Sequence, residues 1–161
     1  KINIEDYNIA AAESILETDL SKNTIFYNRY KNQFFEDIYT KLVFGDLVPS
    51  NIMVGEDDML VFSDFEWVAF DNYMNDYSYL WLHLWRHREW QYRLIEKVIT
   101  NDVNKKMFTM NIIRILIAWF EGYKRDDEER YKIIKNYFND HIWKRYLIAA
   151  GESFEALMNV R

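Results

Sequence analysis

The sequence predicts a mainly α-helical domain with one small β-hairpin, on three observations. Apolar residues recur at helical spacing over most of the chain, two short apolar runs flank a loop at residues 55–58, and glycine and proline are scarce. Half of the 161 residues are hydrophobic and 18% are aromatic, with only 4 Gly and 1 Pro. This composition fits a single domain over residues 1–161 with a core of its own, and it excludes disorder.

Two helices are expected before the hairpin. Residues 5–18 place apolar side chains on one side, and residues 24–41 carry an apolar or aromatic residue at every fourth position from Phe26 to Ile38. Asn23 or Thr24 is placed to cap the second of these helices.

The helical spacing of the apolar residues ends at the predicted hairpin, residues 52–63. Ile52–Val54 and Met59–Phe62 are short apolar runs separated by a four-residue loop, as in two antiparallel strands. Both faces of these strands are apolar, so we expect the hairpin to be covered on both sides.

The C-terminal half, residues 75–161, predicts a helical subdomain. Asn75 can cap its first helix, Gly122 can end the second, and Gly151 can interrupt the third. The expected helices lie at about 75–99 with a break near His87, at about 103–121, and at about 127–157.

Composition also excludes several function classes. The chain has no cysteine, which excludes disulfides, zinc–thiolate sites and thiol catalysis. Its net charge is −6 and it has no basic run, which argues against a nucleic-acid partner. The longest apolar stretch, Ile115–Phe120, is far shorter than the ~20 residues of a membrane span, and the first residues show no signal-peptide pattern. We therefore expect a soluble, cytoplasmic domain.

The four glycines exclude the common phosphate-binding loops. They stand at positions 45, 55, 122 and 151, whereas Walker and dinucleotide-type loops need glycines only a few residues apart. Any phosphate-binding site must therefore use other residues, or this chain must carry only half of such a site.

Three oxygen-bearing side chains are expected to meet at the open end of the hairpin. A turn centred on residues 56–58 places Asn51 beside the residues that precede Asp64, and Asp46 lies on the loop that leads into the hairpin. An amide oxygen and two carboxylates form a hard-ligand site that suits Mg²⁺, which points to metal-assisted phosphoryl transfer. The alternative is turn chemistry, because Asp and Asn favour loops.

These residues resemble the motifs of a known family. Phe44–Asn51 resembles the catalytic loop H-G-D-x-x-x-x-N of the aminoglycoside phosphotransferase and choline kinase family, which has a protein-kinase-like fold. Val61–Leu80 resembles that family's segment around D-F-E-W/Y, and Asp76 follows Asp64 at the family's spacing of twelve residues. The resemblance covers about residues 24–85 and implies the C-terminal lobe of a kinase-like α+β fold.

The resemblance implies a role for each matching residue, with ATP and Mg²⁺ as cofactors. Asp46 would accept or orient the proton of the attacking hydroxyl. Asn51 and Asp64 would hold Mg²⁺, and Glu66 would add a water-mediated metal contact. Met53 would pack beneath the adenine ring. The implied enzyme is a small-molecule kinase whose acceptor is an amino-alcohol such as choline, an aminoglycoside or a sugar.

Two further residues would support the loop. Asp76 would brace it from the following helix, and Phe44, which replaces the family's histidine, would substitute for it by packing. Val48 stands where many members have a second histidine.

The sequence shows no counterpart of the N-terminal lobe that enzymes of this kind have. Only 43 residues precede Phe44, they read as helices, and no V-A-x-K strand is present. The expectation is therefore that this chain is the C-terminal lobe of a longer protein, and that alone it does not turn over ATP efficiently.

Aromatic residues offer a cage for a cationic acceptor, formed by Trp67, Tyr73, Trp81 and Trp85. The alternative is that these rings simply pack in the core.

Other interpretations stay open. His83 and His87 are four residues apart on a helix, but no third ligand is evident, so packing or surface histidines are favoured over a metal site. Phe44, Val48 and the missing lobe are also compatible with a degenerate kinase-like lobe that serves as a protein-interaction module. A missing lobe would also expose an apolar face through which the chain self-associates.

Overall fold

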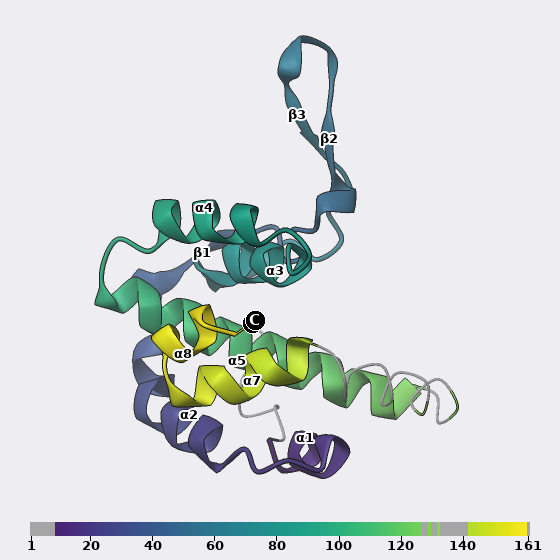
Figure 1. The fold of residues 1–161 in the computed structure, drawn as a ribbon. Coiled ribbons are helices and arrows are strands. Elements are labelled where there is room, and N and C mark those ends of the chain that lie inside the picture. The colour runs from purple at the N-terminus through teal and green to yellow at the C-terminus, as the bar shows by residue number, and fades with distance from the viewer. Residues whose placement is uncertain (1–8, 127–128, 130–131, 133–141, 161) are drawn as a thin grey trace. The chain divides into compact units, whose positions relative to one another are not determined.

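The computed structural model describes residues 9–126, 129, 132 and 142–160, and the chain is mainly helical with two small antiparallel sheets (Figure 1). Within these residues no helix combines the length and apolarity needed to cross a bilayer. The chain divides into two compact units, one formed by residues 34–108 and the other by residues 2–33 and 109–161. We call them unit 1 and unit 2. The prediction of a single domain is not decided by this division, because units of one chain can belong to one domain.

Unit 1 contains the four strands found among the described residues, and it contains the candidate site. Its strands are β1 (Thr40–Val43), β2 (Ile52–Val54), β3 (Leu60–Phe62) and β4 (Ala69–Asn72), and its helices are α3 (Asn75–His83), α4 (Arg88–Val98) and the start of α5 (Asp102–Asp126). Three short 3₁₀ turns precede β1, β2 and β3.

The β1–β4 sheet has one buried side. β1 pairs antiparallel with β4, so that Leu42 lies opposite Phe70 and Val43 opposite Ala69. Val43 is buried, whereas Leu42 and Phe70 are exposed. At the end of β4, the side-chain amide of Asn72 donates to the Phe34 carbonyl and accepts from the Met74 backbone N–H. These bonds fix the sheet to the core of unit 1.

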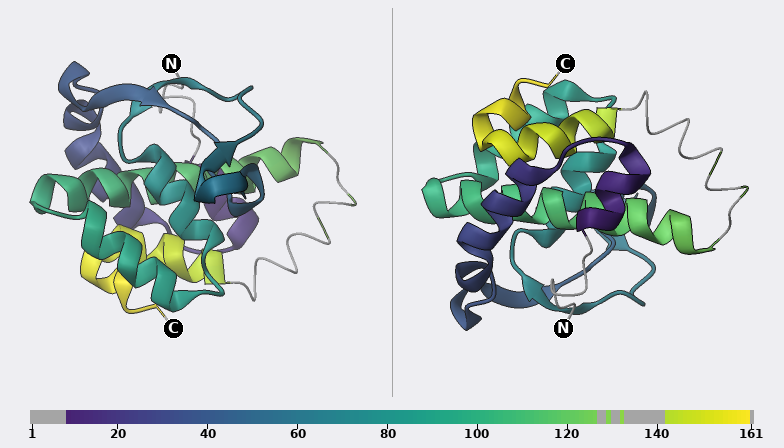
Figure 2. Two further views of the ribbon diagram at one scale, coloured as in Figure 1. Left: turned by 90° about the horizontal axis from the view of Figure 1, so that it is seen from above. Right: turned by 90° about the horizontal axis from the view of Figure 1, so that it is seen from below.

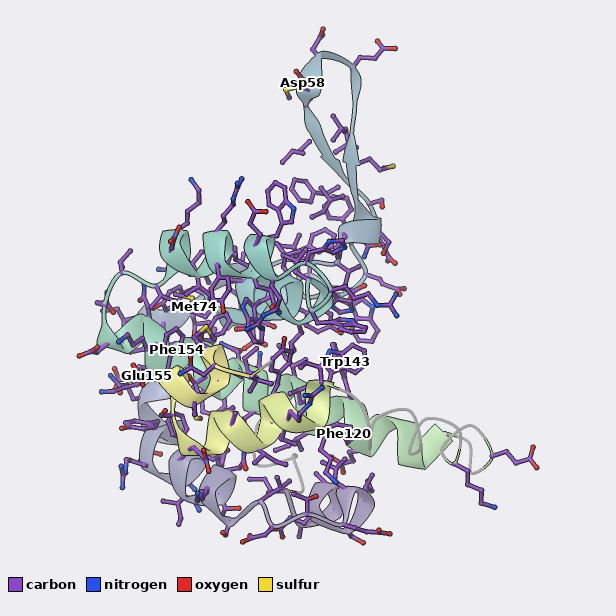
Figure 3. All side chains as sticks on the ribbon, in the orientation of Figure 1. Asp58, Met74, Phe120, Trp143, Phe154 and Glu155 are labelled. Atoms are coloured by element: carbon purple, nitrogen blue, oxygen red, sulfur yellow. The ribbon has the colours of Figure 1, made fainter. Side chains whose placement is uncertain are left out.

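The β2–β3 hairpin has the predicted boundaries but is not covered. Ile52 pairs with Phe62 and Val54 with Leu60, around a loop that begins at Gly55. The hairpin projects away from α3 and α4, with Asp58 at its tip (Figures 1 and 3). Most of its apolar side chains are exposed, among them Val54, which is 70% exposed. The prediction that both faces are covered was therefore wrong.

Unit 2 is built from helices. They are α1 (Ile9–Leu16), α2 (Ser21–Phe34, up to residue 33), the remainder of α5 from Thr109, α7 (Ile142–Glu152) and α8 (Phe154–Met158). α2 and α7 lie side by side (Figures 1 and 2). They are so close at Gly151 that a Cβ added there would come within 2.5 Å of Asn23 Oδ1. Asn23 donates from its amide to the Leu147 carbonyl at 2.7 Å. Gly151 is thus needed for close helix packing.

The helix predicted at residues 24–41 was wrong at both ends. α2 begins at Ser21, whose N–H bonds to the Asp19 carboxylate, so neither Asn23 nor Thr24 caps it. It ends at Phe34, and residues 40–43 form β1 instead. β1 exists because β4, some thirty residues later, supplies its hydrogen-bond partners, and this distant pairing overrides the local helical pattern.

The later helices follow the predicted order with shifted boundaries. The break near His87 is confirmed, because α3 ends at His83 and α4 begins at Arg88. α5 runs through Gly122, which therefore does not end it. α7 runs through Gly151, and the break falls at Ser153, whose Oγ accepts the Ala156 N–H at 3.0 Å.

Some expectations fall outside the described residues. Residues 5–8 of the first predicted helix and most of 127–141 of the last one are among them. Asn75 begins α3 but does not cap it, since its side chain donates to the Asp71 carboxylate at 3.2 Å.

Candidate functional site

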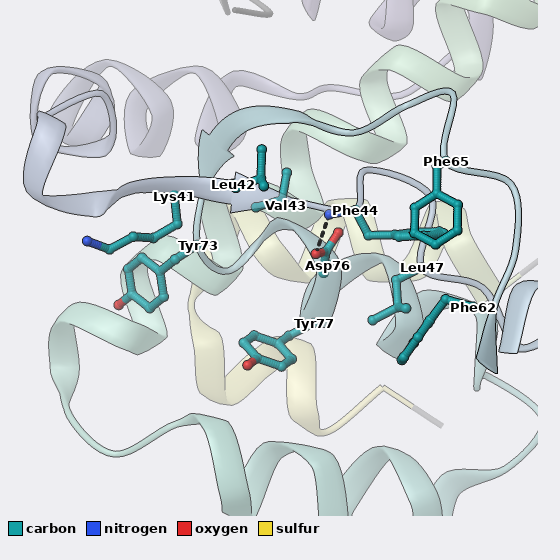
Figure 4. Close-up of a pocket in the computed structure, with 10 residues that line it drawn as sticks. All are labelled: Lys41, Leu42, Val43, Phe44, Leu47, Phe62, Phe65, Tyr73, Asp76 and Tyr77. Atoms are coloured by element: carbon teal, nitrogen blue, oxygen red, sulfur yellow. Dashed lines mark hydrogen bonds between the residues drawn. The ribbon is translucent and has the colours of Figure 1, made fainter. Parts of the chain in front are cut away.

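The loop after β1 is held by a carboxylate from α3. Asp76 accepts two backbone N–H groups, that of Phe44 at 2.7 Å and that of Gly45 at 2.8 Å (Figure 4). Two consecutive amides on one carboxylate fix both the position and the direction of the chain just before Asp46. The contact has the form that the resemblance implies for Asp76.

Gly45 brings the loop against the segment that follows the hairpin. Its backbone is left-handed, with φ +86°, and a Cβ at this position would collide with the Trp67 carbonyl oxygen. Only glycine combines this conformation with so close an approach. The Trp67 backbone is therefore packed on the loop that carries Asp46.

Asn51 links the loop to the base of the hairpin. Its side-chain amide donates to the Asp46 backbone carbonyl at 3.1 Å and to Asp46 Oδ2 at 3.0 Å. The Ser63 N–H donates to the Asn51 carbonyl at 3.0 Å. The predicted register, in which Asn51 lies opposite residues 62–63, is confirmed, so Asp64 begins directly beside Asn51.

Asp64 occupies an unusual backbone conformation. Its φ is +64°, in the left-handed region that non-glycine residues rarely adopt. Strain of this kind persists where the surroundings over-determine the chain, and it clusters at functional sites. Asp57 and Asp58 at the hairpin tip share this conformation, where a tight turn explains it. Asp64 and Glu66 are both exposed.

The side chains expected to hold a metal at this end of the hairpin carry oxygen atoms, the ligand type that Mg²⁺ prefers. Among the described residues, no group of three or more His, Cys, Asp or Glu is placed to hold a metal. The expected ligands Asn51, Asp64 and Glu66 contain only two carboxylates, and Mg²⁺ characteristically takes one or two plus water and phosphate oxygens. Because the Asn51 amide nitrogen is engaged by Asp46, the Asn51 atom left for a cation is Oδ1.

Phe44 packs within an aromatic cluster. Its ring lies 5.2 Å from that of Phe65 in an edge-to-face arrangement and 6.0 Å from that of Phe62. Phe44 thereby connects the loop, the hairpin and the residues after Asp64 by packing.

The same cluster forms one wall of a cavity of about 480 Å³ (Figure 4). Four of the residues that line it are polar, namely Lys41, Tyr73, Asp76 and Tyr77. The remaining walls come from Leu42, Val43, Phe44, Leu47, Phe62 and Phe65. No motif marks Lys41, Leu47 or Tyr77 in the sequence, because β1 and α3 are brought together only by the fold.

The four rings of the suggested cage have different surroundings. Trp81 is 1% exposed and packs edge-to-face on Phe108, so it is a core residue and the cage interpretation is wrong for it. The Tyr73 hydroxyl donates to Asn104, and burial raises its pKa. Trp85 lies beneath the Arg86 guanidinium, 4.5 Å from the ring centroid.

The remaining two predicted ligand contacts lie at the surface. Trp67 is exposed beside the loop, and Met53 is exposed on β2. The roles suggested for them stay predictions.

His83, which the sequence analysis weighed as a metal ligand with His87, lies at the end of α3 and contacts Tyr79. Its ring is stacked on Tyr79, with centroids 5.3 Å apart, and its Nδ1 lies 3.0 Å from the Tyr79 carbonyl oxygen. Burial lowers the pKa of His83, while the hydrogen bond to Tyr79 and the negative charge of Asp46 oppose that change. His83 is therefore within electrostatic reach of Asp46.

Comparison of the chain with protein-family models, with curated proteins and with solved structures gives no match. Function must accordingly be argued from the site itself.

Proposed function

We propose that this chain carries the catalytic loop and metal ligands of an ATP- and Mg²⁺-dependent phosphotransferase that acts on a hydroxyl of a small molecule. One observation carries the proposal: the hydrogen-bonded pair of Asp46 and Asn51 stands on a loop that packs directly against the backbone of Trp67, three residues after Asp64. Two carboxylates and an amide oxygen at the end of one hairpin suit a cation that bridges phosphates.

In this proposal Asp46 receives the acceptor. Its carboxylate orients the attacking hydroxyl and takes the hydroxyl proton as the new P–O bond forms and the bond to the leaving phosphate breaks. Asn51 fixes the Asp46 carboxylate through its amide N–H. Asp76 fixes the backbone one residue earlier, so both groups limit the motion of Asp46.

Asn51 and Asp64 would hold the metal, with Glu66 contributing through water. When bound, Mg²⁺ neutralises the phosphate charge and orients the transferred group. Met53, exposed on β2, would contact the base of the nucleotide. Because the sequence offers no glycine-rich loop to cover the phosphates, we expect nucleotide binding by this chain alone to be weak and turnover slow.

Thermal melting with and without Mg²⁺–ADP tests the proposal. Ligand at 100 times its dissociation constant adds about 2.7 kcal/mol to stability. We expect a magnesium-dependent rise in Tm that Asp64→Asn abolishes, since asparagine tolerates the left-handed backbone and removes only the charge. Asp57→Asn is the matched control, because Asp57 has the same φ of +64° at the hairpin tip. A shift that survives in Asp64→Asn, or no shift in the wild type at saturating nucleotide, contradicts the metal assignment.

A protein-interaction module is the second candidate, favoured by the exposure of both faces of the β2–β3 hairpin. Such a module has no use for a magnesium-dependent nucleotide site, so the same melt discriminates between the two.

A further inference from the structure

The cavity between β1 and α3 belongs wholly to unit 1. Its volume of about 480 Å³ lies within the range of roughly 300–1,000 Å³ that small-molecule sites occupy. The described residues that line it all fall within positions 41–77. Asp46 and the three expected metal ligands are not among them. A ligand in the cavity would therefore contact side chains other than those of the proposed catalysis.

The two ends of the cavity differ in chemistry. Phe44, Phe62 and Phe65 stand at one end, whereas Lys41 and Tyr73 stand at the other (Figure 4). The aromatic end is held together by ring contacts, since the Phe44 ring packs on both of the other two. Phe62 is 40% exposed and Phe65 is 60% exposed, so a large part of their apolar surface has no cover. An apolar ligand group placed there would be bound through the hydrophobic effect.

Lys41 supplies a positive charge at the opposite end. The side chain is exposed, and among the described residues no carboxylate lies within ion-pair distance of its ammonium group. Asp71 lies opposite Lys41 in β4, but it is buried and accepts hydrogen bonds from the Asn72 N–H and the Asn75 amide. The Lys41 ammonium is therefore available to a ligand.

The acidic residue of the lining is already engaged. Each oxygen of Asp76 accepts a backbone N–H group, one from Phe44 and one from Gly45, and these dipoles offset part of its charge. The Tyr77 hydroxyl makes no hydrogen bond to any of the described residues, so it can donate to an oxygen atom of a ligand. Both features favour a negatively charged ligand over a positively charged one.

We propose that this cavity binds an apolar organic anion, whose ring or hydrocarbon body covers the Phe44 cluster and whose carboxylate pairs with Lys41. Burial of the apolar body supplies affinity, and the lysine selects for the negative charge. The inference is independent of the proposed phosphotransferase function, because it uses neither Asp46 nor the expected metal ligands.

Titration of the full chain with two matched probes tests the proposal. 2-Naphthoate has an aromatic body and a carboxylate, and 2-naphthamide has the same body without the charge. In ¹H–¹⁵N NMR spectra, naphthoate should shift the backbone amides of Lys41, Phe44 and Leu47 and should bind about fivefold more tightly than naphthamide. Absence of naphthoate binding, shifts confined to the β2–β3 hairpin, or equal affinity for the two probes overturns the proposal. This comparison needs no variant.

A substitution then tests the role of the charge. Lys41→Met keeps most of the aliphatic stem and removes the ammonium, so naphthoate affinity should fall about fivefold while naphthamide affinity stays unchanged. Lys97→Met is the matched control, because Lys97 is exposed on α4 and does not line the cavity. Unchanged naphthoate affinity in Lys41→Met, or an equal loss in Lys97→Met, overturns the assignment of Lys41.

Discussion

The two small sheets of unit 1 have the same number of strands but are stabilised in different ways. The β1–β4 sheet buries Val43, and Asn72 ties it to the backbone of Phe34 and Met74. The β2–β3 hairpin is joined to the rest of unit 1 at its base, where Ser63 bonds to Asn51, and its apolar side chains are largely exposed. A two-stranded sheet is marginal by itself in water, so the core supplies the stability of the first sheet.

This difference predicts which substitutions in unit 1 affect the fold and which do not. Substitutions in and after β1 should unfold or displace the loop that carries Asp46. Substitutions along the hairpin should leave the fold intact. Three pairs of substitutions test that division, and a fourth experiment concerns pH.

The largest effect is expected for Gly45→Ala. A Cβ at this left-handed position collides with the Trp67 carbonyl, so unfolding stability should fall by about 3 kcal/mol. Gly55→Ala is the hairpin control, because its Cβ would meet Val61 Cγ2 at 3.3 Å and its φ is −82°. That change should cost no more than about 0.5 kcal/mol. Equal costs in urea denaturation would refute the division.

Asp76→Asn comes next. The amide keeps one acceptor oxygen and turns N–H donors toward backbone N–H groups, so we expect a loss of about 2 kcal/mol. Glu56→Gln at the exposed hairpin tip is the matched acid-to-amide control and should stay within about 0.5 kcal/mol of the wild type. Denaturant midpoints measured side by side give the answer, and a cost for Glu56→Gln near that of Asp76→Asn would count against the contrast.

A pair of valines compares the strands directly. Val43 is 5% exposed on β1, whereas Val54 is 70% exposed on β2. Val43→Ala should cost about 1.5 kcal/mol, from the lost burial of two methyl groups and a small cavity. Val54→Ala should change stability by less than about 0.5 kcal/mol. A reversed order would mean that something in solution covers the hairpin.

The smallest effect concerns pH. The pKa of His83 lies below its ordinary 6.5 in the folded chain, so the unfolded chain binds the proton more readily. The contribution of His83 to the free energy of unfolding is therefore fully present above about pH 6.5, and it is lost as the pH falls toward the lowered pKa. His83→Gln should make the decline between about pH 7.5 and about pH 5.5 shallower, while His87→Gln, at an exposed position, should not. Parallel declines in all three proteins would contradict the assignment.

The hairpin and its register were predictable from the sequence, because two short apolar runs and the loop between them act between near neighbours. The pairing of Asn51 with Ser63 follows from the turn at residues 56–58 alone. The spacing of Asp46, Asn51 and Asp64 was likewise readable, since a short hairpin leaves few ways to arrange its two ends. Their roles in catalysis remain predictions.

Other features could not be read from local patterns. Residues 40–41 were predicted to be helical but belong to β1, because the pairing of that strand comes from residues 69–72. Gly151 resembled a helix end but serves close packing against Asn23 of another helix.

The sequence by itself determined which segments are helical over most of the chain, where the hairpin turns, and which oxygen-bearing side chains stand at its open end. Those properties depend on hydrogen bonds and side-chain periodicity within a few residues. Tertiary structure alone decided that Asp76 holds the loop, that Gly45 admits the Trp67 backbone, and that the hairpin is exposed. The physical reason is that each of these depends on contacts between residues distant in the chain, whose energies no local pattern records.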